Sequence, residues 1–212
     1  MLTEDMDGNE GKVMAAITAN GITIEYETTG AATGAATDPA LILVRGLGTQ
    51  LINWPDNLLD RLAGMGFFVV VFDNRDVGLS AKFDSHGAPD LRDLMAKAKA
   101  GEDFDVAYTL EDMAADVIGL MDALNIATAH VAGISMGGAI VQVLAAGHGN
   151  RLRSMASIMA QSGNPDTPLG SPEAMAALMR AGADEDSREG AIAANVETSR
   201  ILTSPKYPTS DA

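Results

Sequence analysis

The stretch Gly133-Ile134-Ser135-Met136-Gly137 places a serine between two glycines. It follows an apolar run that is typical of a buried strand and precedes a stretch with helical character. In such a G-x-S-x-G turn the serine adopts a strained conformation, which is possible because Gly133 and Gly137 have no side chain to clash. The bare pattern arises by chance in roughly one chain in ten at this glycine content. Its place between a strand and a helix favours a nucleophilic Ser135 over a structural serine in a tight turn.

The helix expected after Ser135 offers a way to stabilise negative charge. A helix N-terminus carries a partial positive charge and has N–H groups with no acceptor inside the helix. The turn would direct the backbone N–H of Met136 towards the reacting group, which is what a developing oxyanion requires. The motif therefore predicts acyl transfer, in which Ser135 attacks a carbonyl carbon.

The rest of the sequence predicts a sheet that would position this turn. Asn20-Gly21 is a strong two-residue turn signal, so residues 14–30 should form a hairpin. Short apolar runs then alternate with amphipathic stretches. The predicted strands are 40–46, 67–72, 127–134 and 155–160, and the predicted helices are 52–63, 90–100, 136–147, 172–182 and 187–201, with one more after the capping pair Thr109 and Asp112. This order predicts an α/β fold with a mostly parallel, doubly wound sheet.

In such a sheet, reactive groups gather at the carboxyl ends of the strands. Three junctions of this kind occur, at residues 45–48, 73–80 and 133–137. We interpret the second junction as structural, with Asp73 and Arg75 fixing the loop and Gly78 permitting its turn.

Length and composition restrict the class of protein. The 212 residues suit one α/β domain better than two, and we divide them into an acidic tail (1–12), a core (13–165) and a helical segment (166–212). The absence of cysteine excludes disulfides, a thiol nucleophile and cysteine-bound metals, and neither a metal nor a cofactor is expected. A net charge of −15 argues against binding to nucleic acid. The acidic N-terminus and the short apolar runs predict a cytoplasmic protein without membrane segments.

Three motifs in this order resemble the α/β-hydrolase superfamily: LVRGLGTQ, VVVFDNRDVGLS and VAGISMGG. The run from GLGTQLINWP to VGLSAKFD is similar to its esterase-like members of the aclacinomycin methylesterase type. The resemblance covers residues 15–165 and implies the fold of that superfamily. It further implies a carboxylic-ester hydrolase acting on a small molecule, with Ser135 as nucleophile and the N–H groups of Leu47 and Met136 as the oxyanion hole. The helices after residue 170 would begin a lid over the substrate pocket.

Arg45 departs from the pattern, because many members have histidine or an apolar residue before this glycine. The arginine would narrow the pocket, bind an acidic group or form a surface ion pair.

The general base is not evident from the sequence. In this superfamily the acid and then the histidine follow the serine, and none of the three histidines fits that order. His148 lies a helix length from Ser135, roughly 20 Å away, and His130 precedes it by five strand residues, about 16 Å. Both are interpreted as structural or surface residues. His86 follows a strand at the same sheet edge as Ser135 and is the one candidate base.

The acid is equally open. Asp166 stands where a minority of these hydrolases carry the triad acid, although a turn-forming aspartate is the alternative. The simplest interpretation is a truncated hydrolase that stops before the final strands, the acid and the histidine. A sheet that ends at residues 155–160 would leave an apolar edge, which predicts a homo-oligomer or a strongly aggregating monomer.

Two other classes of protein stay open. A non-catalytic binding protein would keep the fold without the triad, and the scarcity of histidine favours it. A dinucleotide-binding domain is disfavoured, since neither GLGTQ nor GISMGG completes G-x-G-x-x-G and the first strands form a hairpin.

Overall fold

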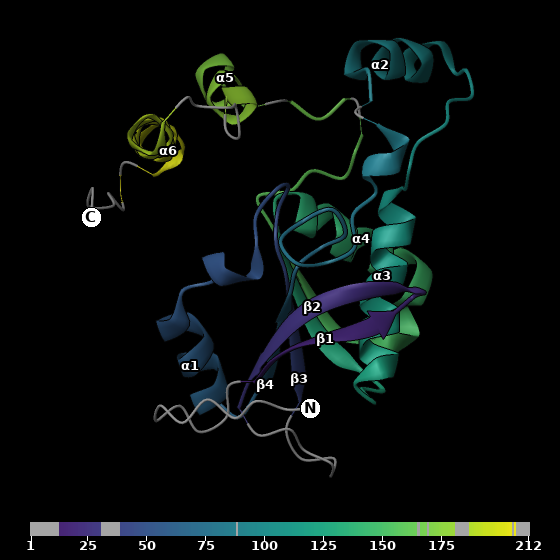
Figure 1. The fold of residues 1–212 in the computed structure, drawn as a ribbon, viewed down its shortest axis with the longest axis vertical. Helices are drawn as coiled ribbons and strands as arrows, with labels where there is room; N and C mark the ends of the chain where they lie inside the picture. Colours follow the sequence, from purple (N-terminus) through teal and green to yellow (C-terminus); the bar gives the residue numbers. More distant parts are fainter. Residues whose placement is uncertain are drawn as a thin grey trace. The chain divides into compact units, whose positions relative to one another are not determined.

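A sheet of six strands forms the centre of the computed structural model, which describes residues 13–30, 39–87, 89–164, 166–168, 170–180, 187–204 and 206 (Figure 1). The strands are β1 (Val13–Ala19), β2 (Ile22–Thr29), β3 (Ala40–Val44), β4 (Phe68–Phe72), β5 (Ala129–Ile134) and β6 (Leu152–Ile158). Their spatial order is β1-β2-β4-β3-β5-β6. Pairing is antiparallel from β1 to β2 and from β2 to β4, and parallel among β4, β3, β5 and β6. The mostly parallel sheet expected from the sequence is therefore confirmed.

The N-terminal hairpin turns where the sequence predicted. Asn20 and Gly21 have φ values of 48° and 78°, so both occupy the left-handed region that a tight two-residue hairpin turn requires. Asparagine and glycine tolerate this region better than other residues do. The turn sets the register in which Ala19 pairs with Ile22.

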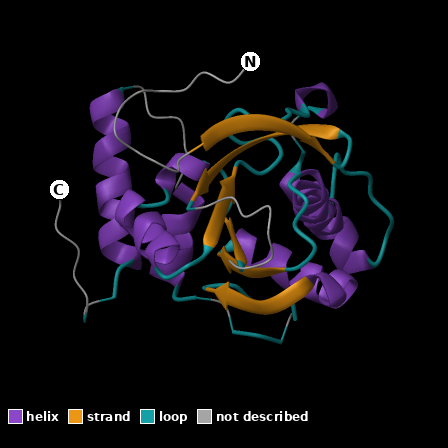
Figure 2. Cartoon of the chain, turned by 90° about the horizontal axis from the view of Figure 1, so that it is seen from below, coloured by secondary structure: helices purple, strands orange, loops and turns teal. Residues whose placement is uncertain are grey.

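Helices cover both faces of the sheet, as Figures 1 and 2 show. One face packs against α3 (Leu110–Ala123) and α4 (Met136–His148), and the other packs against α1 (Asp56–Gly64). The first core includes Ile42, Phe72, Val117, Leu120, Ile140 and Leu144, and the second includes Leu43, Leu51, Trp54, Leu59, Val69 and Val71. Strands β3 and β4 supply side chains to both cores, which explains why their sequences are continuously apolar.

Several predicted boundaries differ from the observed ones, and two of the differences have identifiable reasons. The predicted helix 52–63 is divided into a 3₁₀ turn, η1 (Leu51–Asn53), and α1, because Pro55 lies between them with extended backbone. Strand β6 begins at Leu152 instead of Met155. All of its residues after Leu152 are exposed, so it contains polar residues that interrupt the apolar pattern.

The contacts divide the chain into two compact units, Met1–Ser162 and Gly163–Ala212. The first contains the sheet and α2 (Leu91–Ala100), and the second contains α5 (Pro172–Arg180) and α6 (Arg188–Leu202), which pack against each other. The predicted acidic tail, residues 1–12, lies outside the described residues. None of the described helices is long and apolar enough to cross a bilayer.

Candidate active site

Ser135 lies on the sharp turn between β5 and α4. Its backbone has φ 57° and ψ −123°, a combination that non-glycine residues rarely adopt. The turn is fixed on both sides, since the Ser135 N–H donates to the Ile158 carbonyl at 2.9 Å and the Ser135 carbonyl accepts from the Ala139 N–H at 3.2 Å. Ser135 is exposed, and within the described part of the chain its hydroxyl has no hydrogen-bond partner. The backbone strain thus presents a free hydroxyl to solvent.

Glycines make this turn possible. A Cβ at Gly133 would collide with the Gly137 carbonyl, and a Cβ at Gly137 would collide with the carbonyl oxygen of Val44. A Cβ at Gly46 would lie 3.1 Å from the Cβ of Ser135, so the loop after β3 passes directly beside the serine. These three positions bring the carboxyl ends of β3 and β5 together.

Two backbone N–H groups flank Ser135. Leu47 follows Gly46 in the loop beside the serine, and Met136 is the first residue of α4. Among the described residues, neither N–H group donates a hydrogen bond to a protein acceptor. Unpaired N–H groups at the start of a helix and in a neighbouring loop can donate to an oxyanion.

The loop after β4 is fixed by Asp73, as the sequence predicted. Its carboxylate accepts from the Leu51 N–H at 2.7 Å and from the Leu79 N–H at 3.0 Å. Gly78 has φ 51°, and a Cβ there would collide with the Asp73 carboxylate. The structural interpretation of Asp73 and Gly78 is therefore confirmed.

Arg75 joins this loop to α3 through a buried ion pair. Its Nε and Nη2 donate to the two carboxylate oxygens of Asp116, each at 2.7 Å, and both side chains are almost completely buried. Burial alone would lower the pKa of Arg75, but the hydrogen bond and charge of Asp116 raise it. The guanidinium also stacks on Phe83 and Tyr108, with its central carbon 5.2 Å from each ring centroid. Arg75 is thus a structural cation, as the sequence predicted.

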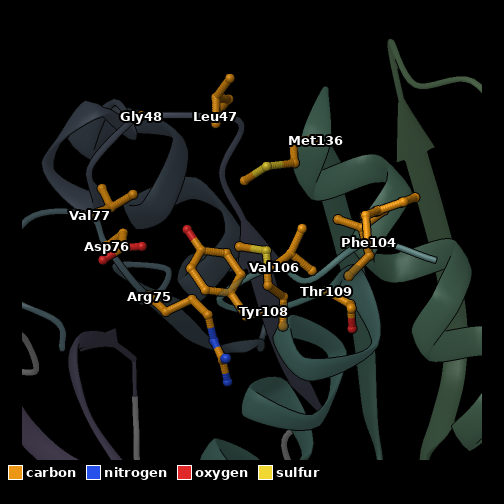
Figure 3. Close-up of a pocket in the computed structure, with 12 residues that line it drawn as sticks. Leu47, Gly48, Arg75, Asp76, Val77, Phe104, Val106, Tyr108, Thr109 and Met136 are labelled. Atoms are coloured by element: carbon orange, nitrogen blue, oxygen red, sulfur yellow. The ribbon is translucent and has the colours of Figure 1, made fainter. Parts of the chain in front are cut away.

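A pocket of about 470 Å³ opens beside the Leu47 and Met136 positions (Figure 3). It is lined mainly by apolar side chains, which come from the loops after β3 and β4, from the segment before α3, and from α3 and α4. The lining residues are Leu47, Gly48, Arg75, Asp76, Val77, Phe104, Val106, Tyr108, Thr109, Leu110, Met113 and Met136. Its volume lies in the usual range for small-molecule sites.

The polar end of this pocket is formed by Asp76 and Tyr108. Burial, together with the hydrogen bond to Asp76 and its charge, raises the pKa of Tyr108 to about 12. Tyr108 is therefore a neutral hydroxyl at physiological pH. Asp76 has φ 65°, and its carboxylate also accepts from the Phe83 N–H at 2.6 Å.

Arg45 lies over the Trp54 ring, with its central carbon 4.7 Å from the ring centroid. Burial lowers the pKa of Arg45, and its Nε and the Trp54 Nε1 are buried without hydrogen-bond partners. Within the described residues Arg45 forms no ion pair, so the surface ion pair considered from the sequence is not found there.

The described contacts of the three histidines are with groups other than Ser135. His86 is exposed in a short 3₁₀ turn, and its Nδ1 approaches the Phe83 carbonyl at 3.3 Å and the Ser85 hydroxyl at 3.5 Å. His130 bonds to Ser154 at 2.7 Å and packs edge-on against Phe67. His148 ends α4. The structure thus does not bring His86 into contact with the serine.

Asp166 belongs to the unit Gly163–Ala212 and is exposed. Its N–H donates to the Asn164 side chain at 2.9 Å, a local turn contact that matches the alternative weighed from the sequence. Among the described residues, no cluster of three or more His, Asp or Glu side chains could hold a metal ion.

Four pocket residues were not predicted from the sequence: Asp76, Phe104, Val106 and Tyr108. They lie in two segments without regular periodicity, at the end of β4 and before α3. The sequence feature that could have indicated them is the capping pair Thr109 and Asp112, which marks the start of α3. The residues just before this start must lie next to the N-terminal end of α3.

The serine turn, the mostly parallel sheet and the helices on both faces define the class of protein. A family model described as "alpha/beta hydrolase fold" matches residues 39–204, and this chain belongs to that family. The similarity to methylesterases expected from the sequence is also confirmed. A rhodomycin D methylesterase from Streptomyces sp. (strain C5) is 31% identical over 122 residues, which are 58% of this chain and 35% of that protein.

Other relatives act on different compounds. 3-Oxoadipate enol-lactonase 2 from Acinetobacter baylyi is 32% identical over 132 residues, which are 61% of this chain and 38% of that protein. The crystal structure of the enol-lactonase from Burkholderia xenovorans LB400 superposes with a TM-score of 0.56 and 27% identity, covering 88% of this chain and 59% of that one. The chain therefore spans between a third and two fifths of the length of the curated relatives it matches.

Proposed function

We propose that this chain carries the nucleophile and the oxyanion hole of a serine hydrolase that cleaves carboxylic esters of small molecules. The observation that carries the proposal is Ser135, an exposed hydroxyl on a strained turn. It is supported by the N–H groups of Leu47 and Met136, which have no acceptor among the described residues. By name, the relatives are a methylesterase and enol-lactonases. Their names support cleavage of the single bond between the carbonyl carbon and the alkoxy oxygen of an ester.

In the proposed reaction the Ser135 Oγ forms a bond to the ester carbonyl carbon as its proton passes to a base. The carbonyl oxygen becomes negative and accepts hydrogen bonds from Leu47 and Met136. The carbon–oxygen bond to the alcohol then breaks, the proton returns to the departing alkoxide, and an acyl group stays on Ser135. The oxygen of a water molecule then bonds to the acyl carbon, the bond between that carbon and the Ser135 Oγ breaks, a proton from the water returns to Oγ, and the carboxylic acid is released.

The identities of the general base and of the triad acid that would serve Ser135 remain predictions. His86 is the proposed base and Asp166 the proposed acid, although their described contacts are local to their own loops. A serine without its base retains the contribution of substrate binding and the oxyanion hole, which amounts to roughly 10³ to 10⁴ over water. We therefore expect slow turnover of this chain unless His86 approaches Ser135 when substrate binds.

Labelling with a fluorophosphonate tests the nucleophile directly, because the reagent bonds covalently to an activated serine. We expect one adduct by intact-protein mass spectrometry, absent in Ser135→Ala and retained in Ser199→Ala. Ser199 is a suitable control because it is an exposed serine on α6. Hydrolysis of p-nitrophenyl acetate should fall to background in Ser135→Ala. A drop in His86→Ala as well would support His86, and an adduct in Ser135→Ala would overturn the nucleophile.

A non-catalytic binding protein is the second candidate function. It is favoured by the absence of any histidine contact to Ser135 among the described residues. Retained binding of apolar ligands together with no covalent label would favour this alternative.

We also propose self-association through β6. This strand lies at the end of the strand order, and Met155 and Ile158 are 42% and 44% exposed. Size-exclusion chromatography that shows a monomer across dilution would contradict it. The cytoplasmic location likewise stays a prediction.

A further inference from the structure

The pocket lined by Leu47 and Met136 is large enough for a fused-ring group. An apolar cavity of about 150 Å³ holds one benzene molecule, and this pocket has about three times that volume, about 470 Å³. Short acyl or alkyl groups would leave much of it filled with water.

The walls of the pocket favour an apolar occupant. Three large apolar side chains that line the pocket are exposed to solvent: Leu47, Phe104 and Val106, with exposed fractions of 80%, 45% and 37%. Exposed apolar side chains grouped in this way mark a binding surface, since a ligand would remove them from water. Phe104 and Val106 belong to the segment between α2 and α3.

The polar end of the pocket, where the Asp76 side chain is exposed, accepts hydrogen bonds. The Asp76 carboxylate accepts from the Phe83 N–H and from Tyr108, which leaves part of its acceptor capacity of about four lone pairs unused. In the described part of the chain Asp76 has no cation partner, because the neighbouring Arg75 is bound to Asp116. Figure 3 shows the Tyr108 hydroxyl on the side of the pocket where Asp76 and Val77 lie. A ligand group that donates a hydrogen bond would therefore be preferred there, and an anionic group would be repelled.

From these observations we propose that Asp76 is a specificity residue, and that the pocket binds an apolar ring group whose hydroxyl donates to its carboxylate. That this group is part of the ester cleaved at Ser135 rests on the proposed function, because Leu47 and Met136 belong to both the pocket and the oxyanion hole. Binding of the ring group itself does not depend on catalysis.

Equilibrium binding of simple naphthalenes separates the two proposals. We expect 2-naphthol, which carries a donor, to bind about tenfold more tightly than 2-methoxynaphthalene, and the 2-naphthoate anion to bind most weakly. In Asp76→Asn the preference for the donor should shrink to about threefold, since a neutral amide oxygen is a weaker acceptor. Asparagine tolerates the φ of 65° and can still accept from the Phe83 N–H, so the loop should keep its conformation.

Two further variants locate the binding. Val106→Trp should fill the pocket and weaken both neutral ligands at least tenfold, whereas Met95→Trp places the same side chain at an exposed position on α2 that does not line the pocket. Ser135→Ala should bind 2-naphthol normally, so loss of labelling with retained binding would leave this inference intact. Equal affinity for the donor and the methoxy ligand, or affinity unaffected by Val106→Trp, would overturn it.

Discussion

The buried ion pair between Arg75 and Asp116 gives the sharpest test of what holds the site loop to the sheet. Asp116→Asn keeps the size of the side chain but removes the charge and turns one acceptor into a donor that faces the guanidinium. Arg75 would keep one bond to the remaining amide oxygen and its bond to the Asp112 carbonyl, which is long at 3.3 Å. Its charge would stay buried and unpaired.

Breaking one side of such a buried pair costs about 3 to 5 kcal/mol. We expect a loss of this size in the free energy of unfolding, out of the roughly 5 to 15 kcal/mol that domains of this kind have. With an m-value of about 2 kcal/mol/M in urea, the unfolding midpoint should fall by about 1.5 to 2.5 M. Far-ultraviolet circular dichroism in a urea titration measures the midpoint.

The same helix provides a matched control. Asp122 pairs with Arg151 at the same 2.7 Å, but its side chain is 62% exposed. Asp122→Asn changes the net charge equally and should cost less than about 1 kcal/mol. The double variant Arg75→Met with Asp116→Leu should recover most of the loss, because no buried charge is left. Equal destabilisation by the two aspartate changes would refute the reasoning.

Five other variants test the structure. Gly137→Ala should abolish fluorophosphonate labelling, because its Cβ would collide with the carbonyls at the end of β3; labelling at the normal rate would contradict the turn geometry. One tyrosine should titrate by tyrosinate absorbance near pH 12 and be absent in Tyr108→Phe. Since an ordinary tyrosine ionises near pH 10, Tyr108 favours the folded state below about pH 10 and loses that contribution between about pH 10 and 12. Thr109→Ala should cost about 1 kcal/mol in urea unfolding. The hydrogen bond from the Thr109 N–H lowers the pKa of Asp112. Asp112→Asn should therefore be less stable than the native chain above about pH 4, where the native carboxylate is ionised in both the folded and the unfolded chain. The difference in stability should disappear as the pH falls below about 4 and the carboxylate becomes protonated. Met155→Lys should shift any oligomer seen by size-exclusion chromatography to monomer, and an unchanged elution volume would argue against β6 as the interface.

Much of the fold could be predicted because its signals are local. The runs at β3 and β4 are apolar throughout since both faces of these strands are covered, and Asn20-Gly21 supplies the left-handed conformations of the hairpin turn. The prediction failed where a local signal was weak. Strand β6 has exposed faces, so nothing in its sequence marked the start at Leu152.

The serine turn could be predicted for the same reason. Its constraint is steric and short in range: Gly133 and Gly137 are required by collisions within a few residues and with one neighbouring strand. The steric requirement therefore appears in the sequence as small residues on both sides of Ser135. The pocket has no comparable sequence pattern, because its walls come from four separate stretches of the chain, 47–48, 75–77, 104–113 and 136, which tertiary packing brings together.

The general base could not be predicted from the sequence because its position, like that of the pocket walls, depends on tertiary packing. A nucleophile in this fold is positioned by its own backbone, whereas a histidine is positioned by a loop whose path depends on what covers it. His86 illustrates this: its 3₁₀ turn is held by contacts with Phe83 and Ser85, which fix its local shape but not its distance from Ser135. Phe83 in turn packs against Tyr108 at the polar end of the pocket, with ring centroids 5.3 Å apart. A ligand that displaces Tyr108 would therefore also act on the His86 turn, so the base is better sought with the pocket occupied than in the free chain.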